Sequence, residues 1–160
     1  MNSITLTLPY PISANRYWAS RIIPAKFPRK AMALTYVTKE AEDYKQQVGW
    51  LIKSAGVRKP ITGRVQIDVR LFPNRPQDWQ KRMRLHGSAW DDTVMCIDLD
   101  NANKVLLDSI KGIAIDDDKW VRRINAERME PDEHGARVVI TITALAVAQP
   151  QVSLFGEVAA

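Results

Sequence analysis

Six aspartates lie between residues 96 and 121, and two of them are close enough in sequence to act together. Asp98 and Asp100 flank Leu99, so in an extended segment both carboxylates point to the same side. Like charges at that separation repel each other unless a cation lies between them. Carboxylate oxygens without a neighbouring His or Cys suit Mg²⁺, or alternatively Mn²⁺, and such ions bind substrate phosphates. The chemistry that this pair predicts is hydrolysis of a phosphodiester.

An amphipathic helix is expected to begin at the second residue of this pair. The helix is predicted to begin at Asp100, because aspartate is a favoured N-cap residue, and to end before Gly112. Lys104 lies one turn after Asp100 on the same helical face. The apolar stripe that faces the core is expected to consist of Ala102, Val105, Leu106 and Ile110.

A second acidic group, residues 116–118, follows the helix. A helix of about a dozen residues is roughly 17 Å long, so the second group meets Asp98 and Asp100 only if the chain doubles back. In that case three or four carboxylates converge beside Lys104. The alternative is that the aspartates are caps in a solvated loop and that Lys104 forms a surface ion pair with Asp100 or Asp108, because short motifs also arise by chance.

The order of residues along this stretch and near the N-terminus is specific. The stretch contains Asp98, Asp100, Asn101, Lys104, Asp108, Gly112, Asp117, Asp118 and Val121, and the N-terminal segment contains Pro9, Pro11, Ser13, Asn15, Arg16 and Tyr17. Both patterns resemble those of the RusA family of Holliday junction resolvases, and the resemblance extends to about Leu145. It departs from the family at Ile97, Ala102 and Trp120, where members commonly have a basic residue, Leu and Gln.

The resemblance implies a Mg²⁺-dependent endonuclease that acts as a homodimer and resolves four-way DNA junctions by paired symmetrical nicks. It makes Asp98, Asp100 and Asp118 the metal ligands. Asp117 is the alternative third ligand, because the aspartate triplet leaves the register open by one residue. Lys104 is expected to meet the charge that develops on the scissile phosphate. The implied catalytic residues are therefore Asp98, Asp100, Lys104 and Asp118.

The net charge of +5 is divided unevenly along the chain. Residues 1–90 contain 16 Lys or Arg and 5 Asp or Glu (+11), whereas residues 91–160 contain 7 and 13 (−6). Lys and Arg that neutralise phosphates give salt-sensitive affinity for DNA, although the same residues could form a merely solvated surface. The candidate DNA-binding residues are Asn15, Arg16, Lys26, Arg29, Lys30, Lys81, Arg82 and Arg84.

Hydrophobic periodicity predicts an α+β domain over residues 1–145, with a small mixed sheet and helices packed on one face. Residues 12–36 are predicted to be a loop because they contain Pro24 and Pro28, and residues 73–95 are predicted to be an irregular insertion. The last two expected strands are predicted to form a hairpin across a polar turn. Strands are expected at residues 3–8, 64–72, 120–129 and 137–144, and a helix from the N-cap Thr38 to Ala55.

The chain is expected to be cytoplasmic and not bound to a membrane. No apolar run approaches the length of a membrane span, and the N-terminus lacks a signal-sequence pattern. The single cysteine, Cys96, excludes an internal disulfide and is expected to be an inert thiol among apolar neighbours.

The last residues, 146–160, are predicted to be a flexible tail. Gln151, Leu154 and Phe155 resemble the short peptide by which bacterial replication and repair proteins bind the DNA polymerase sliding clamp. The alternative is that this segment folds back onto the domain. Two other functions also stay open for the whole chain: a DNA-binding module without catalysis, and an adaptor tethered to the clamp.

Overall fold

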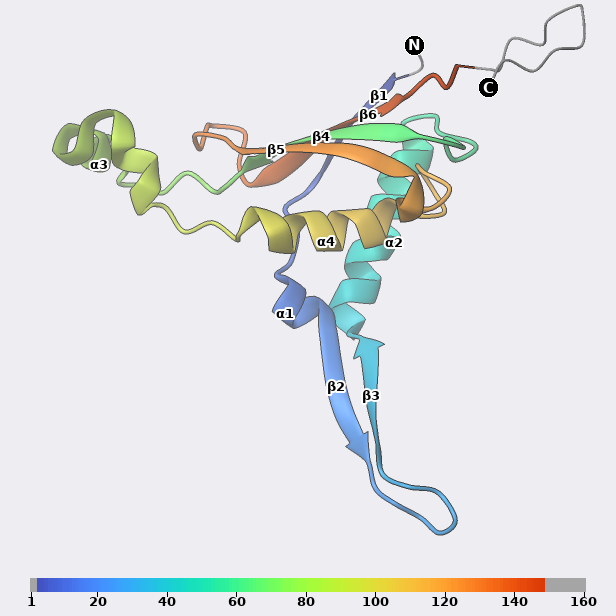
Figure 1. Ribbon diagram of the computed structural model, residues 1–160. Helices are drawn as coiled ribbons and strands as arrows, with labels where there is room; N and C mark the ends of the chain where they lie inside the picture. Colours follow the sequence, from blue (N-terminus) through green and yellow to red (C-terminus); the bar gives the residue numbers. More distant parts are fainter. Residues whose placement is uncertain (1–2, 149–160) are drawn as a thin grey trace, which may run out of the picture.

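The computed structural model describes residues 3–148 of the chain (Figure 1). The strands are β1 (Ser3–Pro9), β2 (Trp18–Ile23), β3 (Met32–Val37), β4 (Val65–Phe72), β5 (Val121–Arg128) and β6 (Arg137–Ala144). The α-helices are α1 (Ala14–Tyr17), α2 (Lys39–Ser54), α3 (Trp79–His86) and α4 (Leu99–Ile110), and two 3₁₀ helices are η1 (Gly87–Thr93) and η2 (Asp118–Trp120).

A four-stranded mixed sheet supports the rest of the fold. Its strand order is β1-β6-β4-β5. The β1–β6 and β6–β4 pairs are antiparallel, whereas β4 and β5 run parallel. Helices α2 and α4 lie on one face of this sheet (Figure 1). The predicted α+β fold, with helices on one face of a small mixed sheet, is therefore confirmed.

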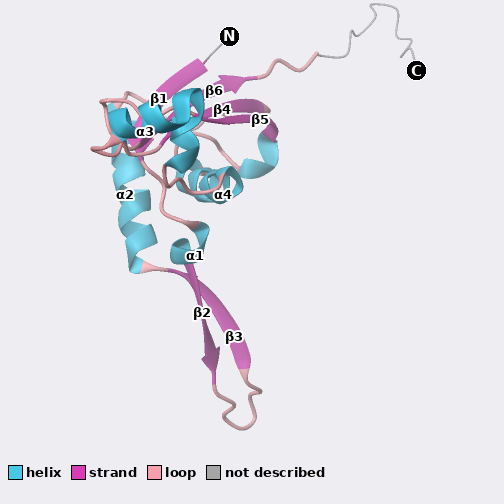
Figure 2. Cartoon of the chain, turned by 90° about the vertical axis from the view of Figure 1, so that its left-hand side faces the viewer, coloured by secondary structure: helices cyan, strands magenta, loops and turns pink. Residues whose placement is uncertain are grey.

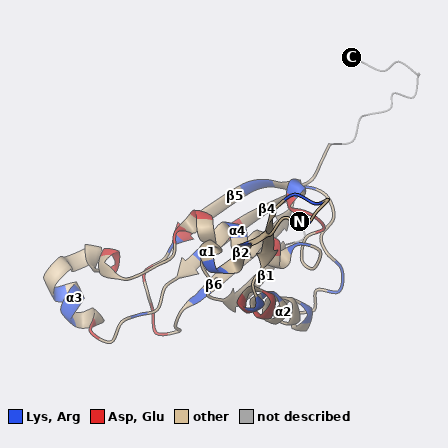
Figure 3. Ribbon diagram, turned by 90° about the horizontal axis from the view of Figure 1, so that it is seen from below, with Lys and Arg blue, Asp and Glu red and all other residues tan. Residues whose placement is uncertain are grey.

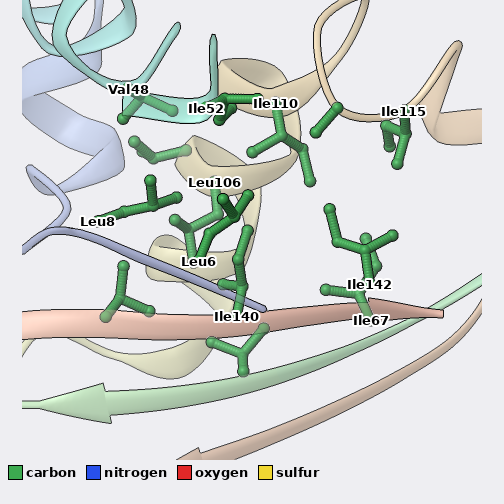
Figure 4. Packing of buried hydrophobic residues seen from close by; sticks show 14 of the residues in the cluster. Leu6, Leu8, Val48, Ile52, Ile67, Leu106, Ile110, Ile115, Ile140 and Ile142 are labelled. Carbon is green, nitrogen blue, oxygen red and sulfur yellow. The ribbon is translucent and has the colours of Figure 1, made fainter. Parts of the chain in front are cut away.

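The hydrophobic core lies between this face of the sheet and helices α2 and α4 (Figure 4). Each large apolar side chain that is fully buried contributes about 1.5–3 kcal/mol relative to an exposed one. Gly49 on α2 lies where a Cβ would be 3.0 Å from Cδ1 of Ile113, so this glycine lets α2 approach the turn after α4. The residues at the centre of the core include Leu6, Leu8, Val48, Ile52, Ile67, Leu106, Ile110, Ile140 and Ile142.

Both long helices form close to where the sequence predicts them. Thr38 caps α2, because its Oγ1 accepts a hydrogen bond from the backbone N–H of Ala41 at 3.3 Å. The predicted start of α4 is two residues late: the N-cap is Asp98, and Asp100 lies inside the first turn. Gly112 follows the end of α4 with a φ of +74°, a conformation that glycine adopts without strain.

The hairpin predicted for β5 and β6 is wrong. β6 lies between β1 and β4, whereas β5 pairs only with the other side of β4 among the described strands. The buried side chains of Ile140 and Ile142 suit a strand with a neighbour on each side. β5 exposes Arg122 and Arg123, and charged side chains are typical of an edge strand.

The loop predicted for residues 12–36 is also wrong. This segment contains α1 and most of an antiparallel hairpin, β2–β3, which we call the arm (residues 18–37). Figures 1 and 2 show the arm projecting from the body of the molecule. Pro24 and Pro28 lie in the turn at the tip, so neither proline interrupts the strand pairing.

The insertion at residues 73–95 has more regular structure than its sequence predicts. It contains α3 and η1, which extend beyond the body next to the start of α4 (Figure 1). Arg82 joins the two helices, because its guanidinium donates hydrogen bonds to Asp78 Oδ1 and to the carbonyl of Thr93, both at 2.9 Å. Every residue of α3 is at least partly exposed, so the helix lacks the apolar stripe that would identify it.

In the described part of the chain, no helix combines the length and the apolar character needed to cross a membrane.

Candidate functional site

The first acidic group lies at the beginning of α4. Asp98 is the N-cap with an extended backbone, and the next turn of the helix contains Asp100. Both residues are exposed. Within residues 3–148, the Asp98 carboxylate forms no capping hydrogen bond. The prediction that both carboxylates lie on one side of an extended segment is therefore wrong. The two carboxylates nevertheless lie within one helical turn of each other and are open to solvent.

Lys104 lies one turn further along α4. Its Nζ is 3.8 Å from Oδ2 of Asp100, and the two side chains are 63% and 70% exposed. An exposed ion pair at this spacing contributes only about 0.3–0.5 kcal/mol to stability. The lysine therefore lies one turn from Asp100 on the same helical face, as expected from the sequence, and is accessible to a ligand.

The segment before Asp98 is fixed by Tyr10, which follows β1. The Tyr10 hydroxyl donates a hydrogen bond to Sγ of Cys96 at 3.4 Å and accepts one from the backbone N–H of Ile97 at 3.0 Å. Burial, followed by the hydrogen bond to Cys96, raises the pKa of Tyr10 to about 12, so the hydroxyl stays protonated at neutral pH. Tyr10 thus determines where the chain enters α4.

Arg128 on β5 fixes an earlier part of the same segment. Its guanidinium donates to the carbonyl oxygens of Asp91 at 2.7 Å and Val94 at 2.9 Å. Trp90 is anchored nearby, because its indole N–H donates to Glu130 at 2.7 Å. These contacts attach the insertion to the sheet just before the acidic pair. Sequence reasoning did not identify Tyr10 or Arg128.

Asp108 has a structural role in the middle of α4. Its Oδ2 accepts a hydrogen bond from the Tyr17 hydroxyl and forms a salt bridge with Lys45 Nζ at 3.0 Å. Burial and then the bond to Asp108 raise the pKa of Tyr17. The network joins α1, α2 and α4 and occupies the Asp108 carboxylate, so Lys104 pairs with Asp100 alone in the described part of the chain.

The second acidic group lies at the opposite end of α4. Lys111, which follows the helix, holds Asp118 at 3.1 Å and Asp117 at 3.6 Å. The pKa of Asp117 is lowered, first because its carboxylate accepts the backbone N–H of Lys119. Asp116 is exposed beside them.

One chain does not bring the two acidic groups together. The length of α4, about 1.5 Å per residue, separates its two ends by roughly 17 Å. Among residues 3–148, no group of three or more His, Cys, Asp or Glu side chains is placed to hold a metal ion. Within a single chain, residues 116–118 therefore do not return to Asp98 and Asp100, as a site made of both acidic groups would require.

The candidate DNA-binding residues lie in three separate places. Lys26, Arg29 and Lys30 are exposed at the tip of the arm, and Lys81 and Arg84 are exposed on α3. Figure 3 shows blue segments, which mark Lys or Arg, on α3. Arg82 is held by the contacts that join α3 to η1. Asn15 and Arg16 lie in α1 at the base of the arm, where Arg16 pairs with Glu40 at 2.7 Å.

Comparison with known proteins identifies the family of the chain. The family model described as Endodeoxyribonuclease RusA matches residues 9–143, from the end of β1 to β6. A comparison with curated proteins gives no match. The family match includes both acidic groups, Lys104, the arm and the insertion, and it confirms the resemblance found in the sequence. RusA proteins are endonucleases that resolve Holliday junctions, and this chain belongs to the RusA family of endodeoxyribonucleases.

Proposed function

We propose that this chain nicks four-way DNA junctions in the cytoplasm in a reaction that requires Mg²⁺, for which Mn²⁺ can substitute. The observation that carries the proposal is the exposed carboxylate pair, Asp98 and Asp100, at the start of α4. Their hard oxygen ligands fit these ions. When bound, such an ion lowers the pKa of water and polarises the scissile phosphate.

The residues of the chain divide the remaining tasks. Asp98, Asp100 and Asp118 hold the ion, with Asp117 beside Asp118 as the alternative ligand. Lys104 donates a hydrogen bond to the phosphate as negative charge develops on it, an interaction that is strong when the donor is already in position.

We propose further that two copies of the chain complete each site. In a two-fold dimer whose α4 helices pack antiparallel, the start of one helix lies beside the end of the other. Asp98 and Asp100 of one copy then meet Asp117 and Asp118 of the second copy, which removes the separation of roughly 17 Å along α4. The same symmetry creates two equivalent sites, which suits paired nicks on two strands.

A stripe on α4 supports this arrangement. Leu99, Asn103 and Leu107 follow each other at four-residue spacing and are half-buried. Asn103 Oδ1 is shielded from solvent and has no hydrogen-bond partner among residues 3–148. A buried polar atom of this kind destabilises the fold unless a partner is supplied. Ile124 of β5, which lies against the same stripe, is 39% exposed, so a second copy would cover an apolar surface here.

The candidate DNA-binding side chains hold the DNA backbone at three places outside the acidic groups. Lys26, Arg29 and Lys30 act at the arm, with Asn15 and Arg16 at its base. Lys81 and Arg84 act from α3, while Arg82 keeps α3 in place. The basic side chains attract the DNA backbone, whereas the acidic groups repel it unless a metal ion is bound there.

The experiment that tests the function compares a labelled four-way junction with linear duplex in Mg²⁺, Ca²⁺ or chelator. We expect symmetrical nicks in the junction with Mg²⁺ and none with chelator, because the carboxylates alone do not activate water. Equal cutting of linear duplex, or cutting in chelator, contradicts the proposal. The same assay separates an endonuclease from a DNA-binding module, which binds the junction without nicking it.

Replacing Lys104 by alanine is expected to lower the single-turnover rate of nicking by about 10² to 10³, the usual effect of losing one donor to a developing charge. The melting temperature is expected to change little, because only a surface ion pair is lost. Lys104→Arg retains the charge and part of the rate. Lys53, an exposed lysine on α2, supplies the matched control Lys53→Ala. If the nicking rate of Lys104→Ala stays within about threefold of wild type, Lys104 serves only as a surface ion-pair partner of Asp100.

We also propose that the tail binds a bacterial sliding clamp. The motif residues Gln151, Leu154 and Phe155 lie outside the described residues. Removal of residues 146–160 is expected to abolish clamp binding in a pull-down and to leave junction nicking by the nuclease domain, residues 1–145, unchanged. A truncated protein that still binds the clamp would show that the motif is not the contact.

A further inference from the structure

The arm is a two-stranded hairpin without a core of its own. In the described part of the chain, β2 and β3 pair only with each other, from Trp18 opposite Val37 to Ile23 opposite Met32. An isolated two-stranded hairpin is marginally stable in water. The arm is nevertheless well anchored at its base, because the Thr38 N–H donates to the carbonyl of Tyr17 at 2.9 Å and Tyr17 itself is bonded to Asp108 on α4.

The tip of the arm displays one aromatic side chain to solvent. Phe27 is 99% exposed. It lies in a tight turn closed by two backbone hydrogen bonds between Lys26 and Arg29, at 3.1 and 2.7 Å. The turn holds the ring away from the rest of the molecule. A fully exposed ring leaves its apolar surface in water, which burial in a complex would remove, so a phenylalanine in this position favours a contact that forms only in a complex.

The charge around Phe27 indicates what kind of molecule covers it. Residues 1–39 contain no Asp or Glu. Lys26, Arg29 and Lys30 surround the ring, and none of these three cations forms an ion pair within residues 3–148. DNA supplies both matching groups, phosphates for the cations and base faces for the ring. A second arm is a poor partner, because it carries the same uncompensated positive charge.

We infer that Phe27 is a wedge that inserts between bases at the branch point of a junction while Lys26, Arg29 and Lys30 hold the flanking phosphates. This inference rests on the proposed function, since it assigns the arm to the same DNA. Apolar side chains that insert between base steps unstack and bend the duplex. A branch point already interrupts base stacking, so insertion is easier there than in continuous duplex. The wedge therefore provides selectivity for branched DNA.

The arm is long enough and sufficiently fixed to act in this way. Six paired residues span about 20 Å at roughly 3.3 Å per residue, and the tip extends further. Through Tyr17 and Asp108 the base of the arm is attached to α4, the helix that begins at Asp98 and Asp100. The position of the wedge in the junction thus determines which phosphate reaches the acidic pair.

The test uses junctions with 2-aminopurine at the branch point, because this base becomes more fluorescent when it is unstacked. Binding is measured with the Asp100→Asn protein, so that no strand is cut. We expect a clear rise in fluorescence, which Phe27→Ala abolishes and Phe27→Trp restores. Phe27→Ala is expected to weaken junction binding by about tenfold or more, as for loss of one stacking contact, and to leave linear duplex binding within about twofold.

Two controls separate stacking from other effects. Trp50 on α2 is also an exposed aromatic residue, at 69%, and Trp50→Ala is expected to change nothing. Replacing Lys26, Arg29 and Lys30 together by alanine is expected to weaken binding to junction and duplex alike and to reduce the salt dependence of binding by about two to three phosphate contacts.

Two results would overturn the wedge. One is a Phe27→Ala protein with unchanged fluorescence and junction affinity. The other is a Phe27→Ala protein that sediments at half the wild-type mass, which would make a second copy the occupant of the tip. Nicking by the wild-type protein is scored separately with the unlabelled junction. Wild-type nicking together with an inert Phe27 rejects the wedge alone, whereas absence of wild-type nicking rejects the proposed function.

Discussion

An Asp100→Asn protein is expected to nick a four-way junction at least about 10³-fold more slowly than wild type. Metal-ion catalysis contributes several kcal/mol to the barrier, and each 1.36 kcal/mol corresponds to about tenfold in rate. Junction affinity is expected to hold or increase, because loss of one negative charge reduces the repulsion between the site and the phosphate backbone. The rate is measured in single turnover with enzyme in excess, and the affinity in Ca²⁺.

The fold is expected to tolerate this change. A carboxylate in the first turn of a helix contributes only about 0.3–1 kcal/mol, so the melting temperature should fall by a few degrees at most. The matched control is Asp43→Asn, since Asp43 is exposed on α2 and distant from α4 in sequence. Near wild-type nicking by Asp100→Asn would show that the pair at the start of α4 does not bind the metal ion.

Elements that bury one face could be predicted from the sequence. The stripe through Val105, Leu106 and Ile110 made α4 recognisable, and the alternation in β4 did the same for that strand. The start of α4 was misplaced because Asp98 and Asp100 are both good N-cap residues. The arm was missed for the opposite reason. It buries neither face, so Ile22 and Ile23 follow one another without a period.

Strand pairing could not be predicted in the same way. β6 pairs with β1 and β4, which are far away in sequence, whereas the hairpin rule considers only adjacent strands. The polar turn after β5 correctly indicates that the chain reverses its direction. It does not indicate which strand β6 pairs with.

The candidate site shows the same division between local and distant information. The spacing of Asp98, Asp100 and Lys104 is local, so the sequence predicts their proximity. Tyr10 and Arg128 position the segment before α4 from 86 residues away and from 37 residues away. A tyrosine between Pro9 and Pro11 was the only signal for the first of them, and it does not reveal the partner.

The placement of Asp118 at the far end of α4 leads to the second large expected effect. Asp118→Asn alone is expected to be as inactive as Asp100→Asn, and a mixture of the two inactive proteins is expected to recover nicking. If each site combines Asp98 and Asp100 of one copy with Asp118 of the other, a mixed dimer contains one site with both changes and one site with neither. Random exchange makes about half of the dimers mixed, so the rate should rise to within about tenfold of wild type.

The products of the mixture provide a further criterion. A mixed dimer has one intact site, so each bound junction should receive one nick in place of the symmetrical pair. The matched control is a mixture of Asp98→Asn with Asp100→Asn, which damages both sites of a mixed dimer and should recover nothing. Asp116→Asn should nick normally, because the family pattern matches Asp117 and Asp118 and not Asp116. This result would show which aspartates of residues 116–118 belong to the site. Only a site shared between two copies can be restored by mixing. If sedimentation shows dimers but the mixture of Asp100→Asn with Asp118→Asn recovers no nicking, a single chain completes its own site.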